Sequence, residues 1–294
     1  MQSSARLHPS LIHPRVSRVS EPFSVEHQGV VLSGEEAGAG APVLLLHGLT
    51  ATRRYVVMGS RLLERTGHRV VAYDARAHGR SSPAPAPHEY SYDLLAGDAL
   101  AVLDSRGIER AVLAGASMGA HTLLRVALSC PERVAGIVVI TPAYSGEQAL
   151  EQARLERWDR LAAGLRTGGV AGFMEAYGRP GGSPAFARTV LTVTRQRLEQ
   201  HEHPDALADA LSAVPRSQPF GSLAELGAIT VPAAVVVSSD TADPEHPEEL
   251  GRAYAAAIRG ARLVTDEPGR SPVAWQGSQL SQIIASVVEA SGLR

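Results

Sequence analysis

Ser117 has the sequence surroundings of a nucleophile. It is the central residue of GASMG (115–119), a G-x-S-x-G motif between an apolar run at 111–116 and a helix-like stretch at 118–129. On such a strained strand-to-helix turn, the serine hydroxyl projects at the carboxyl edge of a sheet, and the flanking glycines prevent a Cβ clash between strand and helix. The backbone N–H of Met118, at the helix start, can point at the oxyanion that forms when a carbonyl is attacked. The motif therefore predicts an activated serine.

Two further motifs precede this turn. HGLT (47–50) follows the apolar run VLLL, where the N–H of Leu49 is expected as the second oxyanion donor, and YDARAHGRSSP (73–83) follows the next apolar run. Together the three motifs resemble the α/β-hydrolase superfamily, whose members often read H-G and D-x-R-G-H-G-x-S at these places. From Pro22 to the end of the chain, the resemblance implies an eight-stranded sheet, a helical cap after the sixth strand and a nucleophile–acid–histidine triad. Ala77 stands where the family often has glycine.

The acid of the triad is expected after the strand that follows the cap. The segment VVVSSDTADPEHPEEL (235–250) offers Asp240 and Asp243. In similar hydrolases the acid often precedes a proline and a second proline opens the next helix, and this pattern fits Asp243. Asp240 fits a turn-capping residue well. We therefore predict Asp243 as the acid.

The usual catalytic histidine is missing. The family places it in a loop after the last strand, but this loop, VTDEPGRSPVAWQG (264–277), contains no histidine, and none follows His246. Arg270 and Ser271 occupy the expected place. Neither can accept the serine proton, because Arg stays protonated and Ser is no base at neutral pH.

Four interpretations stay open. A histidine from elsewhere could be the base, and the candidates are His121, His246, His201 and His203. Asp266 or Glu267 could act instead. The fold could catalyse non-hydrolytic proton transfer, cyclisation or C–C chemistry on a carbonyl compound held in the oxyanion site. Finally, the protein could be a degenerate hydrolase that binds a small apolar ligand without turnover.

The elements that must position these residues follow from the hydrophobic pattern. After two short strands around Gly29, brief apolar runs alternate with amphipathic segments of helix length from Val43 onward. This alternation is typical of buried parallel strands with crossover helices. We predict an α/β fold with a mostly parallel sheet covered by helices on both faces. The expected crossover helices are 92–105, 118–129, 247–258 and 276–290.

The alternation of strands and helices stops between 143 and 220, where the composition favours helices throughout. The helix-breaking sequences RPGGSP and HEHP divide this segment into pieces. A separate helical domain and an inserted cap both fit; strand-like sequence resumes afterwards, which favours the cap. We predict a tail at 1–20, a core at 21–142 and 221–294, and the cap at 143–220.

The cap is expected to roof the pocket. Its larger apolar and aromatic residues either line the pocket or simply pack, and they are Trp158, Phe173, Met174, Tyr177 and Phe220. The tentative pocket residues are His47, Tyr144 and Trp158, although His47 and His78 fit hydrogen-bonding loop residues better than proton carriers.

Composition excludes several other chemistries. All 28 basic residues are Arg, and Lys and Asn are absent. This excludes a phosphate-binding loop with its Lys, Schiff-base catalysis and papain-type Cys/His/Asn catalysis. The net charge of −2 with interspersed signs argues against nucleic-acid or membrane partners, and the single Cys130 permits no internal disulfide. We expect a cytoplasmic protein with a small-molecule substrate and no cofactor or metal.

These observations lead to one prediction and one alternative. The prediction is a serine hydrolase that acts on a small ester, lactone or thioester through Ser117, with the N–H groups of Leu49 and Met118 as oxyanion hole. The alternative is a non-hydrolytic or catalytically degenerate protein of the same fold.

Overall fold

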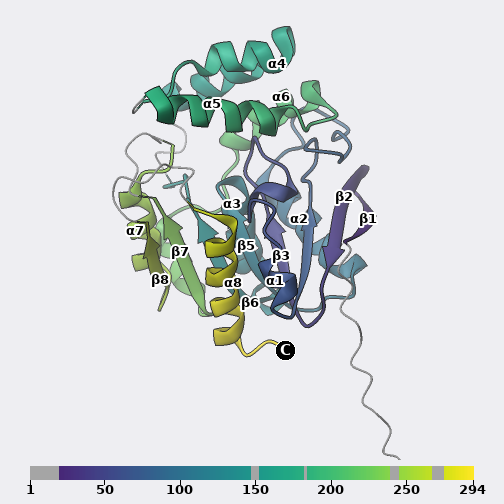
Figure 1. The fold of residues 1–294 in the computed structure, drawn as a ribbon, viewed down its shortest axis with the longest axis vertical. Coiled ribbons are helices and arrows are strands. Elements are labelled where there is room, and N and C mark those ends of the chain that lie inside the picture. The colour runs from purple at the N-terminus through teal and green to yellow at the C-terminus, as the bar shows by residue number, and fades with distance from the viewer. Residues whose placement is uncertain (1–19, 147–151, 182–183, 239–244, 267–274) are drawn as a thin grey trace, which may run out of the picture.

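An eight-stranded sheet runs through the centre of the protein (Figure 1). The computed structural model describes residues 20–294 except 147–151, 182–183, 239–244 and 267–274. The strand order is β1-β2-β4-β3-β5-β6-β7-β8. The strands are β1 (Glu21–His27), β2 (Val30–Ala37), β3 (Ala41–Leu46), β4 (His68–Tyr73), β5 (Ala111–Ala116), β6 (Val134–Ile140), β7 (Ala233–Val237) and β8 (Arg262–Thr265).

The first two strands form an antiparallel hairpin, and the others from β4 to β8 are parallel. The hairpin turn is Gln28-Gly29, and both residues have positive φ (47° and 74°), as the favoured two-residue hairpin turn requires. β2 also pairs antiparallel with β4. The predicted α/β class with a mostly parallel sheet is confirmed.

Helices cover both faces of the sheet (Figure 1). They are α1 (Leu62–Arg65), α2 (Tyr92–Ser105), α3 (Met118–Ser129), α4 (Gln152–Tyr177), α5 (Pro184–Leu198), α6 (Pro204–Ala213), α7 (Glu248–Ala257) and α8 (Gly277–Ser291). The four crossover helices expected from the sequence are α2, α3, α7 and α8, and their observed ends agree within one residue.

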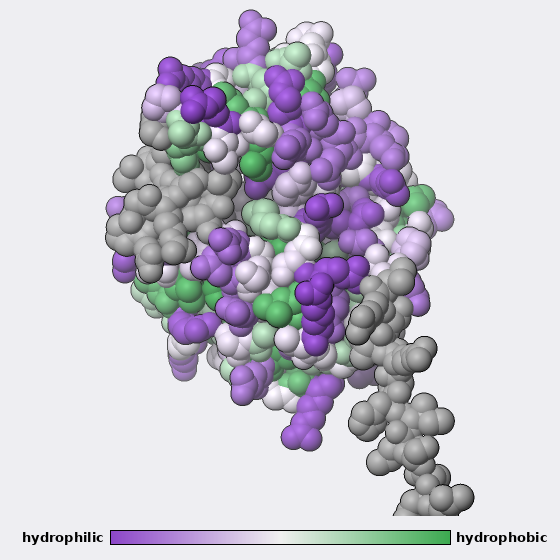
Figure 2. Space-filling view, in the orientation of Figure 1, coloured by the Kyte–Doolittle hydropathy of each residue, from purple (hydrophilic) through white to green (hydrophobic). Residues whose placement is uncertain are grey.

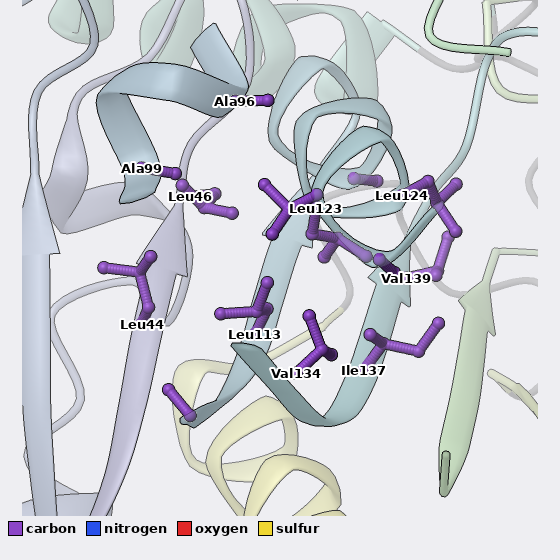
Figure 3. Close-up of a cluster of buried hydrophobic side chains, with 14 of the residues drawn as sticks. Leu44, Leu46, Ala96, Ala99, Leu113, Leu123, Leu124, Val134, Ile137 and Val139 are labelled. Carbon is purple, nitrogen blue, oxygen red and sulfur yellow. The ribbon is translucent and has the colours of Figure 1, made fainter. Parts of the chain in front are cut away.

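The core lies on both faces because the strand side chains alternate. Leu44 and Leu46 of β3 belong to the cluster that includes side chains of α2 and α3, which Figure 3 shows around Leu113. Val43 and Leu45 point to the other face and share a cluster with side chains of α8. A strand buried on both sides has to be apolar at every position, and this explains the continuous apolar runs of the sequence.

The order of the strands places the site. The chain passes from β3 to β4 on one side, and then β5 pairs with β3 on its other side, with Leu46 opposite Gly115. The loops after β3 and β5 therefore leave the sheet side by side at a topological switch point, where open α/β sheets bind ligands.

Helices α4, α5 and α6, which we call the cap helices, lie together across the carboxyl ends of the strands (Figure 1). α4 is broken at Gly169, where φ is 58° and ψ is −146°. The two parts of α4 come close, because a Cβ on Gly164 would lie 2.5 Å from the carbonyl oxygen of Gly172. The breakers RPGGSP and HEHP in the sequence predict the breaks after α4 and before α6, but this break was not predicted.

The surface is mainly polar. In Figure 2 the apolar residues on the visible face are scattered among polar ones. Among the described residues, Val31 and Met58 are the large hydrophobic residues with high exposure. No helix in the described part of the chain has the length and apolar character needed to cross a bilayer.

Candidate active site

Ser117 lies on a strained turn between β5 and α3. Its φ of 51° and ψ of −112° fall outside the regions that a residue with a side chain usually adopts. The glycines of the motif permit the close packing of this turn. A Cβ on Gly119 would lie 2.0 Å from the carbonyl oxygen of Leu46, and one on Gly115 would lie 2.3 Å from that of Gly119. The geometry of this turn is therefore that of a nucleophile elbow.

The loop after β3 directs the N–H of Leu49. The Nδ1–H of His47 donates to the carbonyl oxygen of Gly48 (2.9 Å), and the N–H of Ala51 donates to the same oxygen (2.9 Å). The C=O and N–H of a trans peptide point in opposite directions, so both contacts turn the Leu49 N–H away from His47. The cavity that contains Ser117 is lined by Leu49 as well.

The protonation state of His47 fits this role. Its Nε2 accepts from the N–H of Ala75 (2.9 Å), so the ring carries its proton on Nδ1. Burial lowers the pKa of His47 well below its usual range, and the nearby His78 lowers it further. His78 in turn approaches the carbonyl oxygen of Leu49 with its Nε2 at 2.7 Å. Both histidines are loop-bracing residues, as the sequence analysis favoured.

The backbone N–H of Met118 is the second candidate oxyanion donor. It is the first residue of α3, so its N–H has no carbonyl within the helix to bind. Met118, Leu49 and Ser117 all line the same cavity. The structure thus brings together the three residues that the sequence grouped as nucleophile and oxyanion site.

His246 is a histidine whose side chain lies within hydrogen-bond distance of the Ser117 hydroxyl. Its Nε2 lies 3.0 Å from Ser117 Oγ, although the two residues are 129 positions apart. His246 stands just before α7, in the loop where the family carries its acid. With the proton on Nδ1, the ring accepts the hydroxyl hydrogen of Ser117 at Nε2. Among the open alternatives, this contact favours a histidine from another part of the chain.

Two of the three other histidine candidates, His121 and His201, have backbone partners, and the third, His203, is not part of the described lining of the cavity at Ser117. His121 accepts at Nε2 from the N–H groups of Ala143 (3.0 Å) and Tyr144 (3.2 Å), and its Nδ1 lies 3.0 Å from the hydroxyl of Tyr92. Burial lowers the pKa of His121 to about 3. His201 accepts at Nδ1 from another backbone N–H, and burial also lowers its pKa to about 3. The imidazoles of His121 and His201 therefore stabilise loops by hydrogen bonds to the backbone.

The predicted acid lies outside the described part of the chain. Asp243 and Asp240 lie in 239–244, and Glu267, Arg270 and Ser271 lie in 267–274, all outside the described residues. Asp266 is described, and its Oδ2 accepts from the hydroxyl of Ser238 at 2.8 Å.

The cavity at Ser117 has a volume of about 270 Å³. The cap helices contribute Trp158, Phe173 and Tyr177 to its wall. The indole N–H of Trp158 is buried and has no hydrogen-bond partner among the described residues, so it is a donor available to a bound molecule. Two larger hollows, of about 920 and 730 Å³, lie elsewhere, and their described lining does not include Ser117.

Other predicted pocket residues pack instead. Tyr144 is 3% exposed, donates its hydroxyl to the carbonyl oxygen of Phe220 (2.9 Å) and belongs to the core cluster with it. Neither side chain is part of the described cavity lining, and His47 is absent from it too. Met174 lines the larger hollow beside α5.

Sequence reasoning missed the charged residues beside His246. Arg154 and Arg157 of α4 both pair with Glu245, and all three line the cavity with His246. The spacing of three residues between the arginines is a signal for one helix face, but the sequence does not reveal which carboxylate they meet.

A family model for the alpha/beta hydrolase fold matches residues 41–249. The chain belongs to this family. It is 37% identical over 107 residues to epoxide hydrolase B of Mycobacterium tuberculosis, which is 36% of this chain and 30% of the relative. It is 33% identical over 126 residues to the sn-1-specific diacylglycerol lipase ABHD11 of Danio rerio, which is 40% of this chain and 39% of the relative.

A solved structure similar to this chain is the enol-lactonase from Burkholderia xenovorans LB400. The TM-score is 0.72 at 24% identity, and the match covers 92% of this chain and 100% of the other. This likeness shows the fold, and the alignments with the two curated relatives span less than half of each relative's length. The family and these names support a hydrolase, and the bond that it cleaves has to be argued from the site.

Proposed function

We propose that this protein is a serine hydrolase that cleaves a small ester, lactone or thioester, with Ser117 as nucleophile and His246 as general base. The observation that carries the proposal is the 3.0 Å distance between His246 Nε2 and Ser117 Oγ. A serine hydroxyl is a weak nucleophile until a base within hydrogen-bond reach takes its proton. His246 meets this condition without any histidine after the last strand.

The proposed reaction uses the parts already described. Ser117 Oγ attacks the carbonyl carbon while its proton passes to His246 Nε2, and the N–H groups of Leu49 and Met118 bind the oxygen that becomes negative. The imidazolium then gives its proton to the leaving oxygen or sulfur, which leaves an acyl group on Ser117. Water, deprotonated by His246, then attacks the acyl carbon; the bond to Ser117 Oγ breaks, the imidazolium returns its proton to Oγ, and the acid leaves. Asp243, our predicted acid, would orient the ring.

The cavity supports a small substrate. Its volume of about 270 Å³ lies just below the range typical of ligand pockets, and its wall is largely apolar and aromatic. The Trp158 N–H is a further donor for a polar group of the substrate. A short acyl or lactone substrate fits this combination better than a long-chain one.

A fluorophosphonate probe tests the proposal directly. Wild-type protein should be labelled at Ser117, as seen by mass spectrometry, and should hydrolyse p-nitrophenyl acetate. Ser117→Ala should lose both properties, and His246→Ala should reduce both by about 10²- to 10⁴-fold, the usual contribution of a general base. Absence of labelling in the wild type, with equal ester turnover in Ser117→Ala, would sink the proposal and leave non-hydrolytic chemistry or ligand binding.

A further inference from the structure

We propose that Glu245, held by Arg154 and Arg157 of the cap helix α4, positions His246 for its reaction with Ser117. This inference rests on the proposed function, because it needs His246 as the base. It adds that the cap helices hold the base in place as well as covering the pocket.

The contacts cross from the cap to the loop of the base. The guanidinium of Arg157 forms a close ion pair with Glu245 Oε1, and Arg154 Nε lies 3.8 Å from Oε2 of the same carboxylate. The side chains are 22 to 32% exposed, so water screens these pairs only in part. Glu245 and His246 are consecutive, so the ion pairs that hold the Glu245 side chain also restrict the backbone that carries the imidazole.

The other side of His246 is fixed to the core. Pro247 caps α7, and the N–H of Leu250 donates to its carbonyl oxygen at 3.1 Å. α7 packs tightly on β7, since a Cβ on Gly251 would lie 1.9 Å from Val237 Cγ1. His246 therefore stands between an anchor on the core and an anchor on the cap.

Other ion pairs of α4 provide matched controls. Arg166 pairs with Asp209 of α6, and Asp159 pairs with Arg216 just after α6, so both pairs join parts of the cap region. Neither involves the loop of His246. Substitution at Arg166 removes a comparable charge from α4 without touching the proposed anchor.

The expected effect concerns the chemical step. A displacement of about 1 Å in a reacting group can cost about 10²-fold in rate. We expect Glu245→Gln and Arg157→Gln each to lower kcat for p-nitrophenyl acetate by about 10- to 100-fold with little change in KM. The double variant should lose no more kcat than the more impaired single variant, because both substitutions break the same ion pair between Arg157 and Glu245. Arg157→Lys, which keeps the charge, should recover part of kcat.

The experiment measures kcat and KM together with the rate of fluorophosphonate labelling and the melting temperature of each variant. Arg166→Gln should keep the wild-type kcat and labelling rate. The inference is overturned if Arg157→Gln mainly raises KM, which indicates a direct substrate contact. It is also overturned if the two single effects multiply in the double variant, or if Arg166→Gln lowers kcat as much as Glu245→Gln.

Failure of the proposed function gives a different result. If Ser117→Ala and His246→Ala keep the wild-type activity, the serine mechanism is wrong, and the positioning role falls with it. If those two variants are inactive while Glu245→Gln and Arg157→Gln react like the wild type, the mechanism stands and only the anchor is refuted.

Discussion

The two hydrogen bonds of the His47 ring can be separated by two substitutions. Nδ1–H donates to the carbonyl oxygen of Gly48, and Nε2 accepts from the N–H of Ala75. The amide nitrogen of an asparagine can replace the Nδ1 donor, and the amide oxygen of a glutamine can replace the Nε2 acceptor. His47→Asn therefore keeps the bond that orients the Leu49 N–H, and His47→Gln keeps the bond that supports the fold.

The magnitudes follow from what each variant leaves unpaired. In His47→Asn, the buried N–H of Ala75 loses its acceptor, which costs about 1–3 kcal/mol of stability. In His47→Gln, the Gly48 oxygen still accepts from Ala51, so the loop is loosened but not released. A whole oxyanion donor contributes about 10²- to 10³-fold to kcat. Because one of two contacts remains, we expect a loss of about 10-fold.

The assay compares two quantities across the two variants. The kcat for p-nitrophenyl acetate should fall more in His47→Gln, and the free energy of unfolding in urea should fall more in His47→Asn. This crossed pattern distinguishes loop orientation from general damage, which would lower both quantities together. A larger kcat loss in His47→Asn than in His47→Gln would refute the assignment of the Gly48 contact as the one that orients Leu49.

Three further predictions concern the scaffold. Gly119→Ala places a Cβ 2.0 Å from the oxygen of Leu46, so we expect a strong drop in melting temperature and soluble yield; a wild-type melting curve would contradict this. Asp98→Asn removes the charge that pairs with the buried Arg76. Removal of one partner of a buried ion pair costs about 3–5 kcal/mol, so the free energy of unfolding in urea should decrease by up to that amount. His121 stays neutral when folded, with a pKa of about 3 against 6.5 unfolded, so stability falls as pH decreases through this window. At pH 5 the cost is about 2 kcal/mol, and His121→Gln should show a weaker dependence of stability on pH.

The serine turn could be predicted because local requirements determine it. The glycines at 115 and 119 are needed where backbones touch, and their spacing around Ser117 is visible in the sequence. The ends of α2 and α3 match the prediction for a similar reason, since apolar runs and turns mark them. Ala77 has a φ of 65°, which explains why the family often has glycine there.

The sequence named His246 among four candidate bases and Trp158 as a pocket residue, but it could not single out the proposed base or give the rest of the pocket wall, because both depend on how distant segments meet. His246 reaches Ser117 across 129 residues, and no periodicity encodes this contact. Tyr144 follows the end of β6 by four residues, where the sequence places it near the site, but its hydroxyl donates to the carbonyl oxygen of Phe220 in the core. The break of α4 at Gly169 was also missed, because two glycines inside a helical composition do not by themselves define a turn.

The position of the proposed base, His246, changes which parts of the fold must hold it in place. In the family pattern, the acid and the histidine come from two different loops. The end of one strand therefore positions the carboxylate, and the end of another positions the imidazole. Here His246 stands in the loop after β7, three residues from the predicted acid Asp243, and the sequence after β8 carries no histidine. A single loop then has to set both the distance and the angle of the imidazole. The ion pairs of Glu245 with Arg154 and Arg157 give that loop a second fixed point on the cap, and we infer that the cap compensates for the absence of a histidine in the loop after β8.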